Sequence, residues 1–485
     1  MAMQKLHIRI KAAVILLLMI SVPLFTACED FLDIPLEAQL PVDYEKEPTA
    51  EEGFRYVSAV YAGLRSWGIS VFPYIGMFEI TSDDADKGST PDDAPSMIEM
   101  NSFTYDPAND LLLGFWNDHY RVIGNANFAV NTLNDLNFEN DDIRDALVAE
   151  AKFLRAFLYL RLNLAFGGVP LVETTLTAEE FAQIPRSPVN AVYDFIEGDL
   201  LFAIDHLPSA YSLNEAGRAT SGAARALLAR AYMYQERWPE VRGQTDEIIL
   251  SNSYALYRDF YQLFRVVGQN SSESVFELQL TSRDQGRYRC EYGFVQGPRN
   301  NFSRLQGWGF NVPSARLIDF FDSRGDEIRK FATVLPRGSR TPAGDSISAN
   351  CPNPYYNNKV YTELKYNTID YALDHNIRYI RYAEVLLMNS EAALHTGEDA
   401  ATPLNLVRER AGLEPIDAPT PEDVWDERRA EFALEKHRFF DLVRTGRAPE
   451  VLGPRGFQSG RNEVFPIPQS QIDLSDGVLV QNPGY

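Results

Sequence analysis

Cysteine is scarce in this sequence, with three residues among 485, at positions 28, 290 and 351. So few cysteines exclude a disulfide-rich scaffold, because such scaffolds need several bridges in a short chain. Cys290 and Cys351 can form one disulfide in an oxidising compartment, and two free buried thiols are equally acceptable. In neither case do disulfide bonds determine the fold.

The motifs of common enzyme classes are also missing. The six histidines are scattered and form no H-E-x-x-H pattern, and the sequence has no G-x-S-x-G, Walker or Rossmann motif. We therefore predict no catalytic residue, no metal and no cofactor. A hydrolase without recognisable motifs is the alternative.

Positive charge is in short supply. The chain has 45 lysine and arginine residues against 68 aspartate and glutamate residues, which gives a formal net charge of −23. Such a chain repels the phosphates of nucleic acid, so we predict no nucleic-acid partner. An acidic chain is also not attracted to an anionic membrane surface, so attachment to a membrane would need a covalent lipid anchor.

Long hydrophobic runs are limited to the N-terminus. A basic start is followed by an apolar run over residues 12–24 and by small residues before Cys28. This order predicts a secretory signal peptide over residues 1–27, and the run is shorter than the roughly 20 residues that span a membrane. The stretch ending at Cys28 resembles a bacterial lipobox, which implies lipid attachment at Cys28. A soluble secreted protein is the alternative.

Linkers rich in proline, glycine or serine are absent, so we predict a single domain over residues 28–485. Four segments place alanine, leucine and aromatic residues at helical spacing: 51–67, 144–166, 221–238 and 379–395. Each is interpreted as the first helix of a pair, as in tetratricopeptide (TPR) repeats. We predict an all-α fold with four degenerate TPR-like helix pairs, mainly within residues 51–260 and 379–445.

Long insertions separate the predicted helices, at about residues 81–115 and 265–375. Their glycine, proline, aspartate and asparagine content predicts loops, where binding sites usually lie. Asp83, Asp84 and Asp86 lack the spacing of an EF-hand, so we interpret them as a solvated acidic loop with calcium binding as the alternative.

Charged residues recur at three- and four-residue spacing near the C-terminus: Glu427, Arg428, Glu431, Glu435 and Arg438. We expect them to pair along one helix face as part of the scaffold. A glycosidase would instead need two acids across a cleft, one with a raised pKa, whereas arginines lower the pKa of neighbouring acids.

Six segments, in order along the chain, resemble the pattern of the SusD/RagB family. They are Cys28-Glu-Asp-Phe-Leu-Asp-Ile-Pro35, Trp116-Asn-Asp-His-Tyr-Arg with the residues up to Asn127, Ala149-Glu-Ala-Lys-Phe-Leu-Arg-Ala-Phe157 with Phe166-Gly-Gly-Val-Pro170, residues 220–234, Arg381-Tyr-Ala-Glu-Val-Leu-Leu387, and Asp426-Glu-Arg-Arg-Ala-Glu-Phe432 leading to Arg438-Phe-Phe-Asp-Leu-Val-Arg444. The chain closes with Pro466-Ile-Pro468 and Gln481-Asn-Pro-Gly-Tyr485.

The resemblance implies a SusD-like helical fold and a lipoprotein exposed on the outer membrane. It further implies capture of oligosaccharides for a SusC-like TonB-dependent transporter. Two alternatives stay open: a RagB-like protein whose cargo is peptide, and an adaptor that contacts the transporter without binding a ligand.

Aromatic rings and glycines alternate between residues 288 and 310, which a packed strand or helix does not favour. We expect exposed rings, with Trp308 stacking on a sugar and Asn300 or Arg304 hydrogen-bonding its hydroxyls. The predicted ligand-binding residues are Trp308, Tyr288, Tyr292, Phe310, Asn300, Arg304, Trp67 and Tyr74. Rings that fill a small core under the loop are the alternative.

The same region holds five arginines: Arg283, Arg287, Arg289, Arg299 and Arg304. Guanidinium groups form bidentate contacts with carboxylate and sulfate, so an anionic glycan is one interpretation. Pairing with scaffold or transporter acids is the other.

The lipobox-like sequence yields a first prediction. Replacing Cys28 by serine removes the lipid attachment point, so the variant should fold normally but leave the membrane fraction. Fractionation of cells followed by immunoblotting measures this, with the wild-type chain as control. A Cys28→Ser protein that still partitions wholly into membranes without a partner contradicts the anchor.

Overall fold

The computed structural model describes residues 47–280, 291–301, 306–366 and 375–485. The predicted signal peptide, Cys28, Tyr288, Cys290 and Arg304 lie outside the described residues. Residues Glu47–Tyr485 form one unit by their contacts. Within the described ranges, no helix is both long and apolar enough to cross a membrane.

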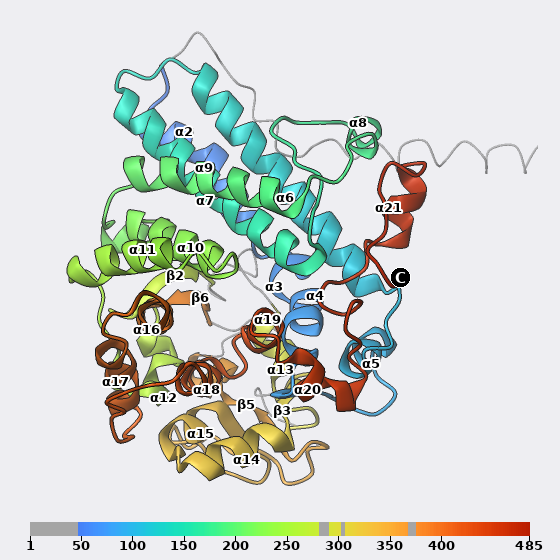
Figure 1. The fold of residues 1–485 in the computed structure, drawn as a ribbon, viewed down its shortest axis with the longest axis vertical. Coiled ribbons are helices and arrows are strands. Elements are labelled where there is room, and N and C mark those ends of the chain that lie inside the picture. Colours follow the sequence, from blue (N-terminus) through green and yellow to red (C-terminus); the bar gives the residue numbers. More distant parts are fainter. Residues whose placement is uncertain (1–46, 281–290, 302–305, 367–374) are drawn as a thin grey trace, which may run out of the picture. The chain divides into compact units, whose positions relative to one another are not determined.

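Helices dominate the described chain (Figure 1). The longer ones are α2 (Ala50–Gly63), α5 (Pro95–Ser102), α6 (Asp110–Asp135), α7 (Asp141–Phe166), α9 (Val189–His206), α10 (Ser221–Met233), α11 (Trp238–Leu250), α14 (Ala315–Arg324), α16 (Tyr382–Thr396), α17 (Ala401–Arg410) and α18 (Pro421–Phe432). The shorter ones are α3 (Trp67–Ser70), α4 (Phe72–Ile75), α8 (Ala178–Ala182), α12 (Phe260–Leu263), α13 (Tyr292–Gln296), α15 (Glu327–Thr333), α19 (Arg438–Arg444), α20 (Ala448–Leu452) and α21 (Gln469–Leu474).

The long helices pack in a series. α2 packs on α6 and α7, α7 on α9, α9 on α10, α10 on α11, and α11 on α16, which also contacts α17 and α18. Alanines on α10 and α16 are fully buried, and their small side chains let the helix axes approach closely. One large apolar cluster therefore runs through the whole series.

Local signals set the helix ends. The Asn140 side chain accepts a hydrogen bond from the Asp142 amide at the start of α7, and Ser314 caps α14 in the same way. α16 ends at Gly397, whose φ of +78° is the left-handed conformation that glycine adopts without strain.

The described strands form three two-stranded antiparallel sheets that join distant segments. β1 (Ala85–Gly88) pairs with β3 (Phe310–Pro313), and β2 (Ser274–Leu278) pairs with β6 (Ile377–Arg381). β4 (Val334–Pro336) pairs with β5 (Tyr355–Asn357). All six of these strands are short; five lie within the two predicted insertions, and β6 begins just after the second.

The mostly helical fold is confirmed, while several helix boundaries were predicted wrongly. The first predicted helix breaks between Gly63 and Trp67, Trp238 starts a second helix instead of ending one, and Tyr379 lies in β6. The loop-rich insertions also contain α5, α13, α14 and α15 besides strands. Consecutive helices α10/α11 and α16/α17 do pack together; their TPR-like character stays a prediction.

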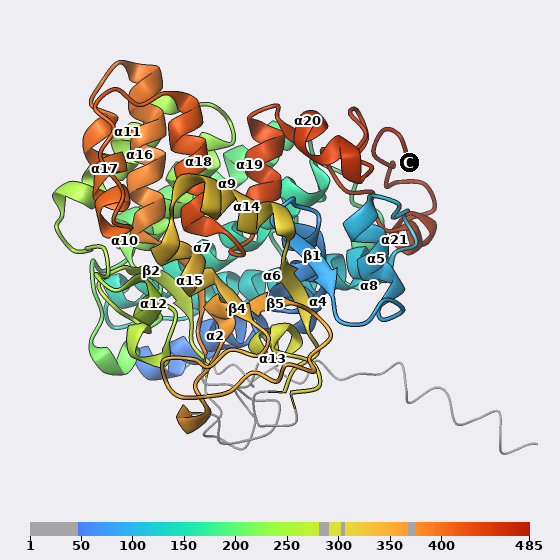
Figure 2. The same cartoon turned by 90° about the horizontal axis from the view of Figure 1, so that it is seen from below.

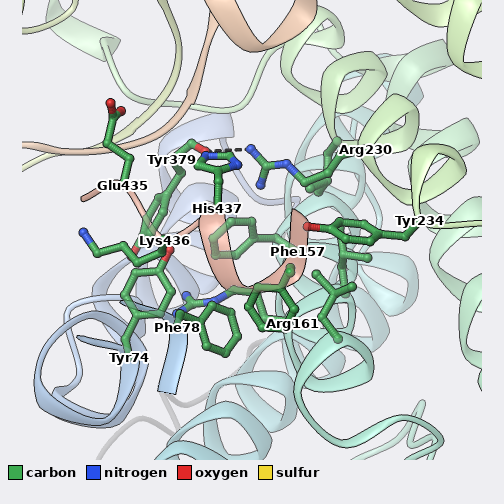
Figure 3. Close-up of a pocket in the computed structure, with 14 residues that line it drawn as sticks. Tyr74, Phe78, Phe157, Arg161, Arg230, Tyr234, Tyr379, Glu435, Lys436 and His437 are labelled. Atoms are coloured by element: carbon green, nitrogen blue, oxygen red, sulfur yellow. Dashed lines mark hydrogen bonds between the residues drawn. The ribbon is translucent and has the colours of Figure 1, made fainter. Parts of the chain in front are cut away.

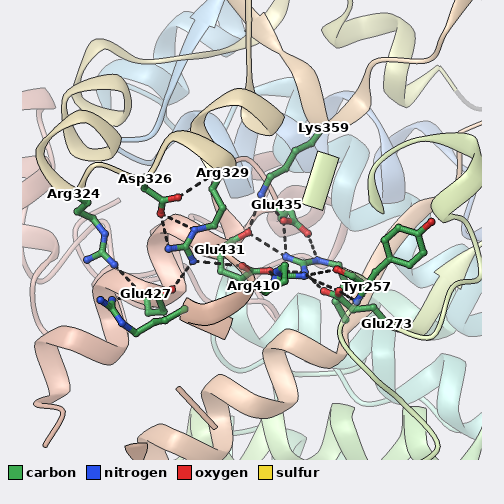
Figure 4. Close-up of polar contacts among 12 residues, drawn as sticks. Tyr257, Glu273, Arg324, Asp326, Arg329, Lys359, Arg410, Glu427, Glu431 and Glu435 are labelled. Carbon is green, nitrogen blue, oxygen red and sulfur yellow. Dashed lines mark hydrogen bonds and ion pairs between the residues drawn. The ribbon is translucent and has the colours of Figure 1, made fainter. Parts of the chain in front are cut away.

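Charged residues of α18 form a buried ion-pair network with other elements, not along their own helix as predicted (Figure 4). The Glu431 carboxylate accepts hydrogen bonds from Arg381 at 2.7 Å and Arg410 at 2.5 Å. Burial raises the pKa of Glu431, but Arg410, Arg381 and Arg329 outweigh it and hold that pKa below its usual range. These charged residues therefore have the structural role that was expected, but they fill it by pairing with residues distant in the sequence.

The same network includes three further acids. Glu427 pairs with Arg329 at 2.6 Å and Arg408 at 2.9 Å. Glu435, just beyond α18, pairs with Lys359 at 2.6 Å and Arg381 at 2.8 Å. Glu273 accepts from Arg410 at 2.8 Å, and thereby links the start of β2 to α17.

The acidic segment at residues 83–86 is not a solvated loop, contrary to prediction. Asp83 and Asp84 are buried, with side chains 4% and 0% exposed, and only Asp86 is exposed. Arg438 contacts Asp83 at 2.7 Å, and Arg429 contacts Asp84 at 2.7 Å. The arginines thus occupy the carboxylates, and in the described ranges no group of three or more His, Cys, Asp or Glu is placed to hold a metal.

The network predicts a large stability effect at Glu431. Glu431→Ala leaves Arg381 and Arg410 short of a partner in the interior, which costs about 3–5 kcal/mol of unfolding free energy. Urea denaturation followed by circular dichroism measures it. The control is Glu422→Ala, an exposed acid on the same helix, which should cost less than about 1 kcal/mol. Equal losses in the two variants would contradict the network's importance.

Candidate functional site

Two partly exposed tryptophans lie side by side. Trp67 begins α3 and Trp308 precedes β3, and their side chains are 40% and 37% exposed. Their ring centroids are 6.0 Å apart at an interplanar angle of 61°. The structure therefore brings together two indoles that the sequence analysis assigned to one site from distant segments.

Further rings support the two indoles from below. Phe72 stacks on Trp67 at 5.5 Å and contacts Trp308 edge to face at 6.3 Å. Phe310 packs on Phe72 at 5.1 Å, and Phe294 packs on Trp308 at 5.9 Å. Trp67, Phe72 and Trp308 are called the aromatic platform below. Edge-to-face and offset contacts of this kind fix ring orientation.

Glycines bring the backbone under the platform into close contact. A Cβ on Gly307 would lie 2.4 Å from the Phe294 carbonyl oxygen, and one on Gly68 would lie 2.1 Å from that of Gly114. The Trp308 amide also donates to the Phe294 carbonyl at 3.1 Å. The glycines flanking Trp308 thus belong to a tightly packed backbone, although the sequence analysis interpreted them as signs of a loose loop.

Polar groups border the platform. The Gly68 amide donates to Asp118 at 2.7 Å, and Arg121 pairs with Asp118 at 3.0 Å, with the arginine side chain 53% exposed. Asp118 and Arg121 can hydrogen-bond the hydroxyls of a ligand lying on the rings. Asn300, which was also predicted as a site residue, is exposed. Phe72, Asp118 and Arg121 were not predicted as site residues, although the segment Trp116-Asn-Asp-His-Tyr-Arg contains two of them.

Three predicted ligand-binding rings are not exposed, contrary to expectation. Tyr74, Tyr292 and Phe310 are 8%, 5% and 4% exposed and belong to the main core cluster. Large aromatic side chains gain more from burial than from standing in water. The Nζ atom of Lys436 lies over the Tyr292 ring, 4.2 Å from the ring centroid. The alternative of a packed core holds for these three rings and not for Trp308 or Trp67.

The anionic-glycan interpretation rests on arginines of which the structure describes one. Arg299 pairs with Asp93 at 2.6 Å and donates to Ser89 at 3.0 Å. Arg283, Arg287, Arg289 and Arg304 lie outside the described residues. Arg299 therefore matches the second interpretation, in which the arginine pairs with a scaffold acid.

Tyr74 lines a small buried cavity of about 40 Å³ (Figure 3). The guanidinium of Arg161 lies 3.9 Å from the Tyr74 ring centroid, and His437 and Lys436 enter from the segment after α18. A cavity of this size holds one or two water molecules and is too small for a sugar ring. It is part of the polar interior, not a ligand site.

Ionisable groups around this cavity have shifted pKa values. Burial raises the pKa of Glu79 to about 8 and lowers that of Lys436 to about 8. Burial also lowers the pKa of His437 to about 4, although Glu384 opposes the shift. His437 is therefore neutral in the folded protein at physiological pH.

The shift at His437 predicts a pH dependence of stability. The unfolded chain protonates this histidine near pH 6.5 and the folded chain only near pH 4. Acidification between these values favours the unfolded state, by about 1.4 kcal/mol per pH unit. His437→Gln should therefore lose less unfolding free energy than wild type between pH 7 and pH 5 in urea titrations. His206→Gln, at a more exposed histidine, is the control; parallel slopes for wild type and His437→Gln would refute the assignment.

Comparisons with known proteins place the chain in a family. A family model described as "SusD family" matches residues 338–485, and one described as "Starch-binding associating with outer membrane" matches residues 76–233. The "SusD-like protein P2" of Formosa agariphila is 26% identical, with 94% of this chain and 97% of the relative covered.

Solved structures share the fold. A "Laminarin binding SusD-like protein" superposes with a TM-score of 0.80 at 29% identity, covering 91% of this chain and 100% of the other. "Surface glycan-binding protein A from Bacteroides thetaiotaomicron in complex with laminarihexaose" gives 0.78 at 26% identity, covering 89% and 99%.

The helical series with its short sheets defines the class: it is the fold of SusD-like binding proteins. The chain belongs to the SusD/RagB family, so the resemblance noted in the sequence is confirmed.

Proposed function

We propose that this protein is a lipoprotein of the outer membrane that captures oligosaccharides on the aromatic platform and delivers them to a SusC-like TonB-dependent transporter. In this proposal residues 1–27 are the signal peptide, Cys28 carries the lipid, and residues 28–485 act as a single domain. Tethering of the binding protein beside its transporter raises the local ligand concentration, which compensates for a weak single site.

The single observation that carries the proposal is the exposure of Trp67 and Trp308 over a fixed ring base. Burying an indole is the usual outcome, so two adjacent half-exposed indoles need a reason. Sugar rings present C–H faces that pack on aromatic planes, while their hydroxyls need donors and acceptors at the edge. Arg121, Asp118 and Asn300 supply such groups.

The ligand class proposed for the first tests is a laminarin-type glucan. Two solved relatives of the same fold bear names that include laminarin or laminarihexaose. The SusC-like partner and the lipid anchor are proposed from the family and from Cys28.

Binding without hydrolysis agrees with the surroundings of Asp93, an acid two contacts away from Trp308. The Ser89 amide donates to the Gly309 carbonyl next to Trp308, and the Ser89 hydroxyl donates to Asp93. That hydrogen bond, with Arg299 adding to it, holds the pKa of Asp93 below its usual range. A glycosidase needs an acid whose pKa is raised, so Asp93 is unsuited to donate a proton.

The platform yields a prediction for binding. Trp308→Ala removes one stacking face and should weaken binding of laminarihexaose by about 1–3 kcal/mol, by analogy with base stacking on aromatic side chains. Isothermal titration calorimetry measures the affinity, and thermal unfolding confirms that the variant is folded.

The matched control is Trp238→Ala, which removes an indole stacked on His395 away from the platform. It should bind as wild type does. If Trp308→Ala also binds as wild type does, the site lies elsewhere. Binding of extended peptides in place of glycans would favour the RagB-like alternative.

A further inference from the structure

A second concave site lies apart from the platform and is lined by residues of α14, α15, β4 and β5. Figures 1 and 2 show where these helices and strands lie in the fold. Its volume is about 460 Å³, within the range of ligand sites and large enough for one or two sugar rings. It is called the α15 cleft below.

The wall of the α15 cleft offers flat apolar faces. Phe331 on α15 is 54% exposed, and its ring packs on Tyr261 at 5.2 Å, which fixes its orientation. Tyr355 of β5 is half-buried, and Pro336 and Pro342 are exposed. An exposed phenylalanine at the mouth of a cavity forfeits the gain from burial, and a ligand ring that covers it restores that gain.

The charges balance among those lining residues of the α15 cleft that the structure describes. Lys330 and Arg340 are matched by Asp322 and Glu327, and Lys330 pairs directly with Asp322. A site for a strongly anionic or cationic ligand carries an excess of the opposite charge, so this balance favours a neutral one. Ser339 and Thr341 add hydroxyl groups at the edge.

Two buried polar atoms of the lining lack hydrogen-bond partners among the described residues: the Tyr261 hydroxyl and Oδ1 of Asn358. Tyr261 and Asn358 are 7% and 3% exposed. The Asn358 amide nitrogen donates to the Phe331 carbonyl at 2.8 Å, which fixes its side chain. Unsatisfied buried groups of this kind are destabilising, and water or ligand hydroxyls can satisfy them.

The β4–β5 sheet connects the α15 cleft to the platform. Pro336 pairs with Tyr355 and Leu335 with Tyr356, and adjacent residues of a strand point to opposite faces. Tyr355 lines the cleft, whereas a Cβ on Gly309, beside Trp308, would lie 3.3 Å from the buried Tyr356 ring. One strand therefore separates the cleft from the backbone that carries the platform.

We propose that the α15 cleft is a second carbohydrate site, which takes a single neutral sugar unit such as the end or a branch of a bound glycan. The sugar lies against Phe331 and Tyr355, and its hydroxyls reach Ser339, Arg340 and Asn358. The proposal rests on the proposed function only for the class of ligand. Its location and its residues are independent of Trp67 and Trp308.

The test uses saturation-transfer NMR on the full mature chain with the methyl glycosides of glucose, galactose, mannose and xylose as probes. The background is the Trp67→Ala/Trp308→Ala double variant, in which the platform is removed. At least one glycoside should still receive saturation, and adding Phe331→Ala should weaken its binding about tenfold, by analogy with aromatic stacking.

Ile328→Ala is the matched control, because Ile328 is 43% exposed on the same helix and does not line the cleft. It should leave the signal unchanged. Tyr355→Ala, tested in the same background, should weaken binding as Phe331→Ala does and serves if that variant fails to fold. No saturation of any glycoside in the double variant, or a signal that survives both cleft substitutions, overturns the proposal. Failure of laminarihexaose to depend on Trp308 would instead count against the platform alone.

Discussion

The buried ion pairs made by α18 and α19 are the constraint on which the rest of the structure depends. Glu431 and Glu427 tie α18 to β6, α15 and α17, while Arg438 and Arg429 reach Asp83 and Asp84 at the start of β1. Most of these partners are buried, and Arg410 and Arg429 are at most partly exposed, so removing a buried member leaves an uncompensated charge inside the protein. The network can therefore be formed only when the C-terminal helices dock on the N-terminal part in one register.

The positions of the rings in the aromatic platform depend on that docking. Asp83 precedes β1, β1 pairs with β3 at Gly88 and Phe310, and Trp308 lies two residues before Phe310. On the other side, Gly68 contacts the Gly114 carbonyl of α6 so closely that no side chain fits, and this positions Trp67. Two exposed rings are thus held together by strands, helices and charges from four parts of the chain.

The helices and the family could be predicted from the sequence, because apolar spacing and ordered motifs are local signals. Trp67 and Trp308 could be assigned to one site from the sequence, because each lies next to a predicted loop. Tyr74, Tyr292 and Phe310 were wrongly expected to be exposed, because the exposure of a ring depends on tertiary packing. Asp83 and Asp84 were misjudged for the same reason: their arginine partners lie hundreds of residues later. Nearly all of the α15 cleft lies in the second predicted insertion, where binding was expected, but none of its residues was singled out, because its walls come from two helices and two three-residue strands that meet only in the folded chain.

Binding on the aromatic platform can be seen directly in a crystal structure of the protein grown with laminarihexaose. We expect sugar rings within about 4.5 Å of the Trp67 and Trp308 side chains, with hydroxyls directed at Arg121, Asp118 or Asn300. An ordered hexasaccharide bound elsewhere, with both indoles bare, would contradict it.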